Sequence, residues 1–308
     1  MSLPEEFTAL AREVNNWGRW GDADEIGTLN LITAEVVRRG VASVKSGKRF
    51  ALALPLSADG PQTGALPGRV NPLHVMTQVN TSYSPDPDGV RANDDAVVMG
   101  LQSATHWDAL AHVSYSGRIY NGFPADSITN AGASKCSIDT APAIVSRGVL
   151  LDVARAKGHD SLEAGYAITS ADLDEAADWA NVAVEAGDIV LIRTGHMRLL
   201  DAGERQAFMY PSPGPGMDAV RWFRRKDIAA VATDNLAFEV LPGERSDLFL
   251  PVHLLDLVEM GLLQGQNFSL EALASDCVDD GQYTFLLSAS PEPFVAAVGA
   301  PVQPVAVK

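Results

Sequence analysis

Short apolar runs alternate with helix-like segments along this chain, and the two kinds follow each other in no repeating order. Runs rich in Val, Ile and Leu predict strands, because branched side chains pack well on a pleated surface. Apolar residues that recur every three to four positions predict helices, one between Ile32 and Gly47 and one from its cap Ser170 to Ala180. The predicted strands cover residues 50–54, 73–79, 97–104, 148–153, 189–194 and 228–233.

Two further apolar runs lie near the C-terminus, at residues 283–287 and 294–298. They predict buried strands that pair with strands from much earlier in the chain. Such pairing favours a mixed sheet or a barrel-like core over a simple doubly wound fold. Residues 57–71 and 82–95 are rich in Pro, Gly, Asn and Asp, which predicts long loops of the kind that shape binding sites.

Composition limits the number of domains and the kind of partner. The chain has 308 residues, of which 46% are hydrophobic, so there is enough apolar material for one domain over residues 1–308. Lys and Arg number 23 against 39 Asp and Glu, which gives a net charge of −16 and argues against binding to a phosphate backbone. We therefore expect a small-molecule substrate and no nucleic acid as partner.

Cysteine content and the apolar runs predict the compartment. The chain contains only 2 cysteines, Cys136 and Cys277, which cannot form a disulfide framework and are typical of a reducing environment. The N-terminal segment lacks the basic and apolar regions of a secretion signal. No apolar run approaches the roughly 20 residues that span a bilayer. The sequence therefore predicts a cytoplasmic protein with no membrane contact.

The segment from Gln102 to His112 holds the densest candidate chemistry. Because strand side chains repeat every second residue, a strand here would project Gln102, His106 and Asp108 from one face, with His112 one helical turn later. Imidazole nitrogens and a carboxylate suit a divalent cation such as Zn²⁺, Mn²⁺ or Fe²⁺. The alternative is a pair of ordinary core histidines, but a buried aspartate needs a partner, so we predict metal ligation by His106 and Asp108.

This segment resembles the signature of the metal-dependent cyclase family, which includes bacterial kynurenine formamidases and isatin hydrolase. The family pattern is H-x-G-T-H-x-D-x-x-x-H, and Thr105, His106, Asp108 and His112 match it. Gln102 stands in the place of the first family histidine. That departure exchanges a strong ligand for a carboxamide.

A second family signature is a proline, valine and histidine that lead into a short helix and then a metal-binding glutamate. Residues 250–253 match its first part, and Gln266 takes the place of the glutamate. The resemblance extends over most of the chain, including residues 17–21, 24–30, 147–152 and 187–195. It implies an α+β, cyclase-like fold of the swivelling β/β/α kind, assembled as a homodimer or homotetramer.

The resemblance also implies a function: hydrolysis of a C–N bond in a small amide, formamide or lactam on an aromatic or cyclic compound. In this interpretation His106, Asp108 and His253 hold the cation, with Gln102 and Gln266 as weaker partners. We expect one ion per chain, Mn²⁺ or Zn²⁺, because neutral carboxamides do not offset the repulsion between two dications.

His112 is the predicted general base, and later the acid that protonates the leaving nitrogen, because an imidazole titrates in the required range. The cation would lower the pKa of its bound water and polarise the substrate carbonyl. Aromatic side chains and one more histidine are candidates to contact the substrate, with core packing as the alternative for each: Trp17, Trp20, His74, Trp107 and Phe123.

Other reactions remain open at this stage. The same site is compatible with lactone hydrolysis, with a cyclisation or dehydration, or with a protein that only binds a small ligand. A serine hydrolase is disfavoured because the chain has no G-x-S-x-G motif. We interpret residues 211–216 as a rigid loop rather than a phosphate cradle, and His159 and His196 as surface residues.

Overall fold

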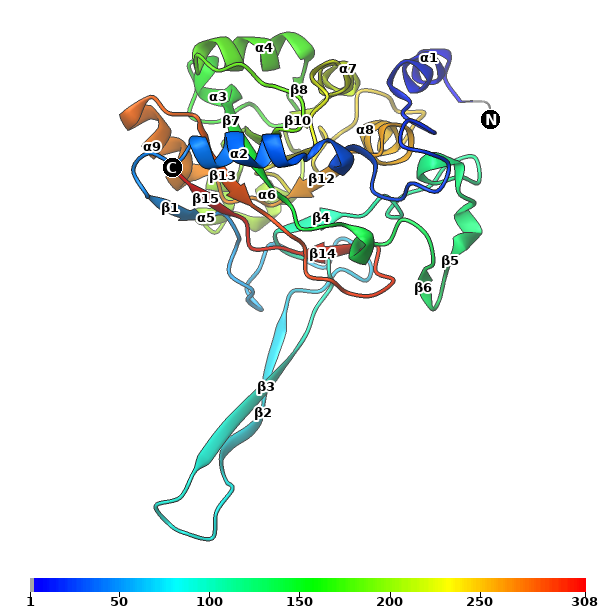
Figure 1. Ribbon diagram of the computed structural model, residues 1–308. Helices are drawn as coiled ribbons and strands as arrows, with labels where there is room; N and C mark the ends of the chain where they lie inside the picture. The colour runs from blue at the N-terminus through cyan, green and yellow to red at the C-terminus, as the bar shows by residue number, and fades with distance from the viewer. Residues whose placement is uncertain (1–2) are drawn as a thin grey trace.

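The computed structural model describes residues 3–308, and a nine-stranded mixed sheet that curls into a half-barrel forms its centre (Figure 1). The strand order is β1-β15-β13-β7-β9-β11-β12-β4-β14. The four central strands from β7 to β12 run parallel, and all outer pairs are antiparallel. In chain order these strands are β1 (Arg49–Ala51), β4 (His106–Asp108), β7 (Val145–Asp152), β9 (Ile189–Arg193), β11 (Ala230–Thr233), β12 (Leu263–Gln266), β13 (Thr284–Ser288), β14 (Gly299–Pro301) and β15 (Val305–Val307).

Both faces of the parallel strands are buried, because successive side chains point into two different cores. On β9, Leu191 belongs to one hydrophobic cluster and its neighbours Val190 and Ile192 to the other. A strand buried on both faces is an uninterrupted apolar run, which explains why the sequence predicted this one well. The mixed sheet that the late apolar runs favoured is confirmed.

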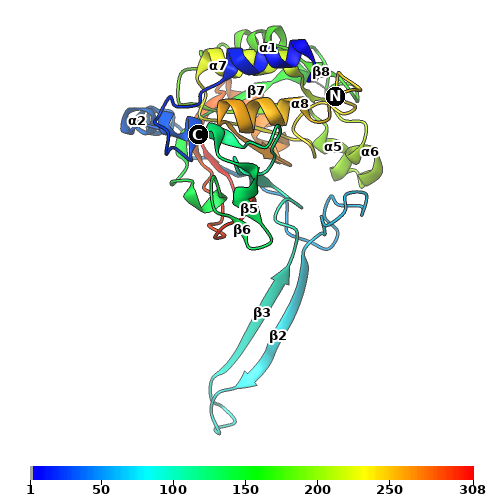
Figure 2. The ribbon, with the colours of Figure 1, turned by 90° about the vertical axis from the view of Figure 1, so that its right-hand side faces the viewer.

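Helices cover the sheet from two sides (Figures 1 and 2). One core includes side chains of four helical segments: α1 (Glu5–Val14), α4 (Ser170–Trp179), α7 (Met217–Lys226) and the π-helix η5 (Leu254–Met260), which directly follows α8 (Pro251–His253). The other core includes α9 (Glu271–Asp280) and residues of the connections between 109 and 144. The remaining helices are α2 (Ala34–Ala42), α3 (Val153–Ala156), α5 (Met197–Asp201) and α6 (Arg205–Met209), with single 3-10 turns η1 (Gly27–Leu31), η2 (Tyr120–Gly122), η3 (Ala125–Ser127) and η4 (Ile138–Thr140).

A long two-stranded ribbon, which we call the arm, projects from this body (Figures 1 and 2). It consists of β2 (Leu73–Ser82) and β3 (Arg91–Val98), joined by residues 83–90. The remaining short strands pair locally: β5 (Ile128–Thr129) with β6 (Gly132–Ala133), and β8 (Ala167–Ile168) with β10 (Gly214–Pro215). The predicted loop over 82–95 is therefore shorter than expected, because β3 begins at Arg91.

Two predicted strands are wrong. The run 97–104 does not continue as a strand, because β3 ends at Val98 and the Ser103 amide donates to Gly100 O in a tight turn. The run 294–298 is irregular, with Val295 83% exposed and Ala296 at a φ of 60°, and the strand beside it is β14. Apolar composition alone does not say whether a run finds a pairing partner.

Helix boundaries also differ from the prediction. The first predicted helix ends at Ala42, before Gly47. The N-cap of α4 is Thr169 rather than Ser170, because the Thr169 side chain and the Asp172 side chain form a reciprocal capping box. The basic helix α7 buries Trp222 and Phe223 and keeps its charged side chains toward the solvent. None of the helices over residues 3–308 is long and apolar enough to cross a membrane.

Candidate metal centre and active site

Strands β4 and β12 bring the candidate ligands together, although they are far apart in the chain. The two strands pair antiparallel, with Gln264 opposite Asp108 and Gln266 opposite His106. Residues 106 and 108 are two positions apart on β4, so their side chains project from the same face, as the sequence predicted. His253 reaches the same face from the end of α8.

Asp108 is the centre of this cluster and is fully buried. Its Oδ1 lies 3.4 Å from His106 Nε2 and 3.6 Å from His112 Nε2. Its Oδ2 accepts a hydrogen bond of 2.6 Å from Gln266 Nε2 and lies 3.9 Å from His253 Nε2. Burial by itself would raise the pKa of Asp108, but His112, with His106 and His253, outweighs it and holds this pKa below its usual range.

His106 and Asp108 face each other with unpaired acceptors. His106 Nδ1 lies 2.7 Å from Ala104 O, and because a carbonyl only accepts, Nδ1 carries a proton, which leaves the lone pair of the neutral ring on Nε2. His106 Nε2 and Asp108 Oδ1 are both buried and have no hydrogen-bond partner, and the same holds for the Oε1 atoms of Gln264 and Gln266. Buried acceptors without a donor are costly, and a cation between them removes that cost.

Glu239 orients His253, and the sequence analysis missed it. His253 Nδ1 donates to Glu239 Oε1 at 2.5 Å, and the same carboxylate accepts from the backbone amides of His253 (2.9 Å) and Val252 (3.2 Å). This bond directs the His253 Nε2 lone pair toward Asp108, as carboxylate partners do for metal-binding histidines. The available signal was an acidic residue in the apolar run 236–241, where a buried charge needs a partner.

His112 differs from the other two histidines in its access to solvent. Its side chain is 17% exposed, against 0% for His106 and 4% for His253. Burial lowers the pKa of His112, and His253 and Arg69 add to this effect against the opposing influence of Asp108. The imidazole is therefore neutral near pH 7 and able to accept a proton. Arg69, from the predicted loop 57–71, is a second residue that the sequence analysis missed.

Gln102 does not hydrogen-bond to Asp108 over the described residues, but its amide lies beside Gly299, the residue opposite Asp108 on β14. It sits in the turn after β3 rather than on a strand, so the predicted alternation with His106 does not apply to it. Its Nε2 lies close to Gly299 on β14, where an added Cβ would stand only 2.7 Å away. No hydrogen bond joins Gln102 to Asp108 in the described chain, whereas Gln266 makes one.

The aromatic candidates occupy different places. Trp107 is fully buried, packs edge-on against Phe268 and donates from Nε1 to Ala289 O, so the structure gives it the core role. Trp17 is 36% exposed and donates from Nε1 to Val258 O, on the helix that follows His253.

The other predicted substrate contacts are two half-buried aromatic rings and a histidine on the arm. Trp20 lies under the Arg19 guanidinium and Phe123 under the Lys135 ammonium. His74 is on the arm, where it pairs with Asp95 at 2.9 Å and is exposed, so it neither packs in the core nor joins the cluster.

Two histidines outside the cluster were predicted to be surface residues. His159 is exposed, as predicted. The prediction for His196 is wrong: the ring is buried, stacks on Phe208 and hydrogen-bonds to Phe208 O at 3.0 Å. An aromatic neighbour in the helix α6 supplies the packing that the local sequence around His196 does not show.

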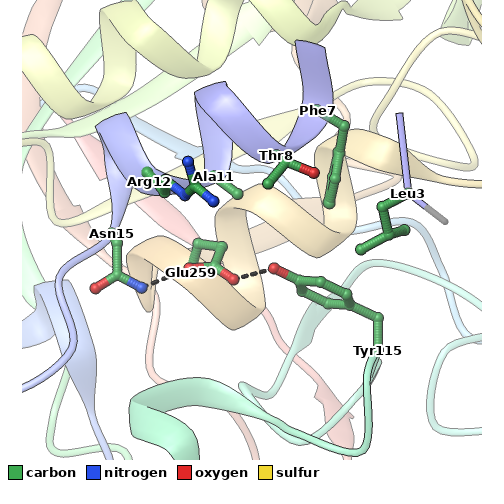
Figure 3. Close-up of a pocket in the computed structure, with 8 residues that line it drawn as sticks. All are labelled: Leu3, Phe7, Thr8, Ala11, Arg12, Asn15, Tyr115 and Glu259. Carbon is green, nitrogen blue, oxygen red and sulfur yellow. Dashed lines mark hydrogen bonds between the residues drawn. The ribbon is translucent and has the colours of Figure 1, made fainter. Parts of the chain in front are cut away.

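A cavity of about 360 Å³ lies between α1, η5 and Tyr115 (Figure 3). Glu259 stands between Tyr115 and Asn15, and both side chains donate to it. Burial and the contact with Glu259 raise the pKa of Tyr115 above its usual range, which keeps the phenol as a donor. The cavity contains none of the predicted ligands, and its buried carboxylate is already paired, so the cluster around Asp108 remains the candidate active site.

The charged and imidazole side chains of the cluster do not make a complete ligand set for a divalent cation, and neutral carboxamide oxygens would have to complete it. Over residues 3–308, no three side chains of His, Cys, Asp or Glu form a metal-ligand set by themselves. His106 and His112 approach one oxygen of Asp108, and His253 approaches the other. The unpaired carboxamide oxygens of Gln264 and Gln266 would complete the set, and a mixture of imidazole, carboxylate and carboxamide suits Mn²⁺ or Zn²⁺.

Comparison with known proteins identifies relatives of the whole chain. The sequence profile of a family described as "Putative cyclase" matches residues 50–240. A crystal structure of a novel cyclase is 39% identical, with 97% of this chain and 99% of that chain covered and a TM-score of 0.88. This match confirms the predicted α+β, cyclase-like fold. No curated protein matches the sequence.

More distant solved structures share the fold. Isatin hydrolase A from Labrenzia aggregata, bound to benzyl benzoate, is 20% identical, with 88% of this chain and 98% of that chain covered and a TM-score of 0.63. A predicted metal-dependent hydrolase from Bacillus stearothermophilus is 18% identical, with 84% and 97% covered and a TM-score of 0.51. At these identities the likeness extends to the fold alone.

Proposed function

Because this chain belongs to the cyclase family, we propose that it is a metal-dependent hydrolase that cleaves a C–N bond in a small amide, formamide or lactam. We propose further that the substrate carries an aromatic or cyclic group. The isatin hydrolases and metal-dependent hydrolases that share this fold support a hydrolytic reaction. The proposal rests mainly on one observation, the unpaired acceptors of His106 and Asp108 that face each other at 3.4 Å.

His106, Asp108 and His253 would hold the cation, with Gln266 beside them. One divalent ion, Mn²⁺ or Zn²⁺, would lower the pKa of a water molecule and polarise the substrate carbonyl when bound. Glu239 keeps the His253 lone pair directed at the site through its 2.5 Å hydrogen bond. Asp108 is ionised, which supplies the negative charge that a cation needs.

His112 moves the proton in this mechanism. As a neutral imidazole with partial solvent access, it accepts the proton from the attacking water as the new C–O bond forms. The C–N bond then breaks, and the same imidazole returns the proton to the leaving nitrogen. Because the water supplies one proton to the acid product and one to the amine, no other proton donor is needed.

The test combines metal analysis with a substrate panel. Protein purified without chelators is analysed for metal, reloaded with Mn²⁺ or Zn²⁺, and assayed on N-formyl anilines, cyclic amides and lactones of matched ring size. We expect activity on the C–N substrates that is lost on chelation and restored by the metal. Activity only on lactones, or full activity in metal-free protein, would contradict the proposal.

Asp108→Asn is the matched variant for this test, because it keeps the shape of the side chain and removes its charge. We expect it to lose both the metal and turnover. A variant with an equivalent change outside the cluster, Asp178→Asn on the exposed face of α4, should keep both. If the wild-type protein binds no metal and turns over none of the substrates, a non-catalytic ligand-binding role replaces the proposal.

A further inference from the structure

Arg69 is a half-buried arginine whose guanidinium has no partner. Its side chain makes no hydrogen bond and no ion pair with any residue from 3 to 308. The other arginines that lack a side-chain partner over this range, Arg12, Arg38 and Arg49, are all exposed to solvent. A half-buried guanidinium has lost part of its hydration, so it needs an acceptor, and the described chain does not supply one.

The backbone around Arg69 is fixed against the turn that leads to the candidate ligands on β4. The Gly100 amide donates to Val70 O at 3.1 Å, and a Cβ added at Gly100 would stand 3.4 Å from Arg69 Cα. Earlier in the same loop, Gln62 Nε2 donates to Ser103 O at 3.0 Å. The guanidinium is therefore carried by a loop that is anchored beside the cluster.

The charge of Arg69 acts on the solvent-accessible side of the cluster. Arg69 is one of the cations that lower the pKa of His112, which requires the two side chains to lie near each other. His112 is the most exposed of the three histidines around Asp108. Gln102, in the same turn as Gly100, lies beside the residue opposite Asp108 on β14. A substrate that enters the site past His112 would therefore pass Arg69.

Two hydroxyl groups in the same contact between loop and turn also lack partners. Ser103 is fully buried, and its Oγ makes no hydrogen bond within the described chain. The Oγ1 atom of Thr63, which follows Gln62 in the loop, is likewise buried and unpaired there. Each hydroxyl can donate one hydrogen bond. A guanidinium and two hydroxyls are donors of the kind that a carboxylate accepts from.

Charge balance favours an anionic ligand at this place. A bound dication and Arg69 would both be positive, and the ligand set opposes them with the carboxylate of Asp108, because Gln266 is neutral. An anion on the substrate would offset this excess, whereas a cation would be repelled. The planar fork of a guanidinium also matches a carboxylate in two parallel hydrogen bonds.

We propose that Arg69, with the hydroxyls of Thr63 and Ser103, forms a subsite for a carboxylate group carried by the substrate. The inference rests on the proposed hydrolase function and narrows its substrate class to amides, formamides or lactams that bear a carboxylate. Arg69 is then a specificity-determining residue, while His112 keeps the proton transfer. The carboxylate binds as a group remote from the C–N bond that is cleaved.

Matched acids and amides test this specificity. The three isomers of formamidobenzoate carry the carboxylate at different positions of the ring, and the formamidobenzamides replace it with a neutral group. We expect at least one acid to exceed its amide by about tenfold or more in kcat/KM, mainly through KM, because a remote contact contributes equally to substrate and transition state.

Variants of Arg69 assign that preference to one side chain. Arg69→Gln should abolish the preference for the acid, and Arg69→Lys, which keeps the charge without the planar fork, should retain part of it. Arg38→Gln removes the same charge from an exposed position on α2 and should leave the preference unchanged. Equal kcat/KM values within all three acid and amide pairs, or a preference that survives in Arg69→Gln, would overturn the proposal.

Equilibrium binding separates the subsite from the reaction. Calorimetry with aminobenzoates and aminobenzamides on the metal-loaded protein needs no turnover, and the acid should bind about tenfold more tightly until Arg69→Gln removes the difference. Binding through Arg69 in a protein that hydrolyses no formamide would support the subsite and contradict the reaction. Equal binding of acid and amide in a protein that hydrolyses formamides would contradict the subsite and support the reaction.

Benzoate distinguishes a group on the substrate from a separate anion. If the carboxylate subsite belongs to the substrate site, benzoate should inhibit hydrolysis competitively, and Arg69→Gln should weaken this inhibition about tenfold. Inhibition that does not compete with the substrate would place the anion elsewhere and overturn the assignment of Arg69 to substrate recognition.

Discussion

At the scale of single residues, His106 and His112 lie at similar distances from Asp108 but differ in their exposure to solvent. Both Nε2 atoms approach Asp108 Oδ1, at 3.4 and 3.6 Å, but only His112 has access to solvent. A ligand is better buried, and a proton-transfer group must reach the substrate. Exposure, rather than distance, is therefore what assigns these two side chains different roles in the proposed mechanism.

This assignment predicts how His112→Ala behaves. We expect the variant to keep its metal and to lose turnover by about a hundredfold or more, the usual contribution of a general base. Metal content and kcat measured on the same preparation test this, with His106→Ala, which should lose the metal, as the comparison. Loss of the ion from His112→Ala would instead make His112 a ligand.

The hydrogen bond from His253 to Glu239 leads to a second prediction, which concerns metal affinity rather than proton transfer. Glu239→Gln keeps an acceptor for His253 Nδ1 but removes the charge that strengthens the hydrogen bond and the basicity of Nε2. We expect metal affinity to fall about 10- to 100-fold, the range found for partners of metal-binding histidines. Titration with Mn²⁺ or Zn²⁺ measures this, and Glu163→Gln at an exposed position should bind as the wild type does.

At the scale of elements, the π-helix η5 contains a buried carboxyl group with no partner. Both Oδ atoms of Asp256 are buried without a hydrogen bond, and burial, with a smaller effect from Glu239, raises the pKa of Asp256 well above its usual value. Since the folded state holds a proton that the unfolded chain releases near pH 4, the contribution of Asp256 to stability is largest below about pH 4 and falls as pH rises toward the folded pKa of this group.

Asp256→Asn should therefore remove this pH dependence. A neutral carboxamide mimics the protonated acid, so we expect the variant to be more stable than the wild type at pH 8, by about 1 to 3 kcal/mol. Burial also raises the pKa of Asp234, to about 6, but Asp234 is present in both proteins, so its contribution cancels in the difference between them. Denaturant unfolding at several pH values measures the difference, and parallel pH profiles would contradict the prediction.

Elements also show where sequence patterns are sufficient and where they are not. The strand β9 could be predicted because burial on both faces leaves an unbroken apolar run. The strand β2 could be predicted too, but nothing in its pattern says that both faces are exposed, since apolar residues are expected to meet a core. The run 97–104 was misread because one apolar stretch contains both the end of β3 and a turn.

At the scale of the whole molecule, the candidate site combines local and distant sequence. His106 and Asp108 are two residues apart, so alternation along one strand could predict them. Gln266 meets them only because β12 pairs with β4, and the resemblance to the family, not the pattern, indicated this position. Glu239 belongs to no motif, and its role follows only from the contact with His253.

The same whole-molecule arrangement predicts the number of metal ions. Asp108 is the carboxylate that contacts the three histidines, while Glu239 is occupied by His253, and Gln266 is neutral. Two dications a few ångströms apart repel strongly, and a second ion needs bridging carboxylates that this cluster does not offer. We therefore expect one ion per chain, measured by elemental analysis after saturation with Mn²⁺ or Zn²⁺.

Gln266→Glu sharpens this last prediction, because it places a second carboxylate where the amide of Gln266 now lies 2.6 Å from Asp108 Oδ2. Without a cation the two carboxylates repel, so the metal-free variant should be less stable than the wild type, and saturating metal should recover more stability in the variant. We also expect metal to bind more tightly and a second ion to become measurable. Two ions per chain in the wild-type protein would contradict the prediction, because neutral Gln266 would then suffice to hold the pair.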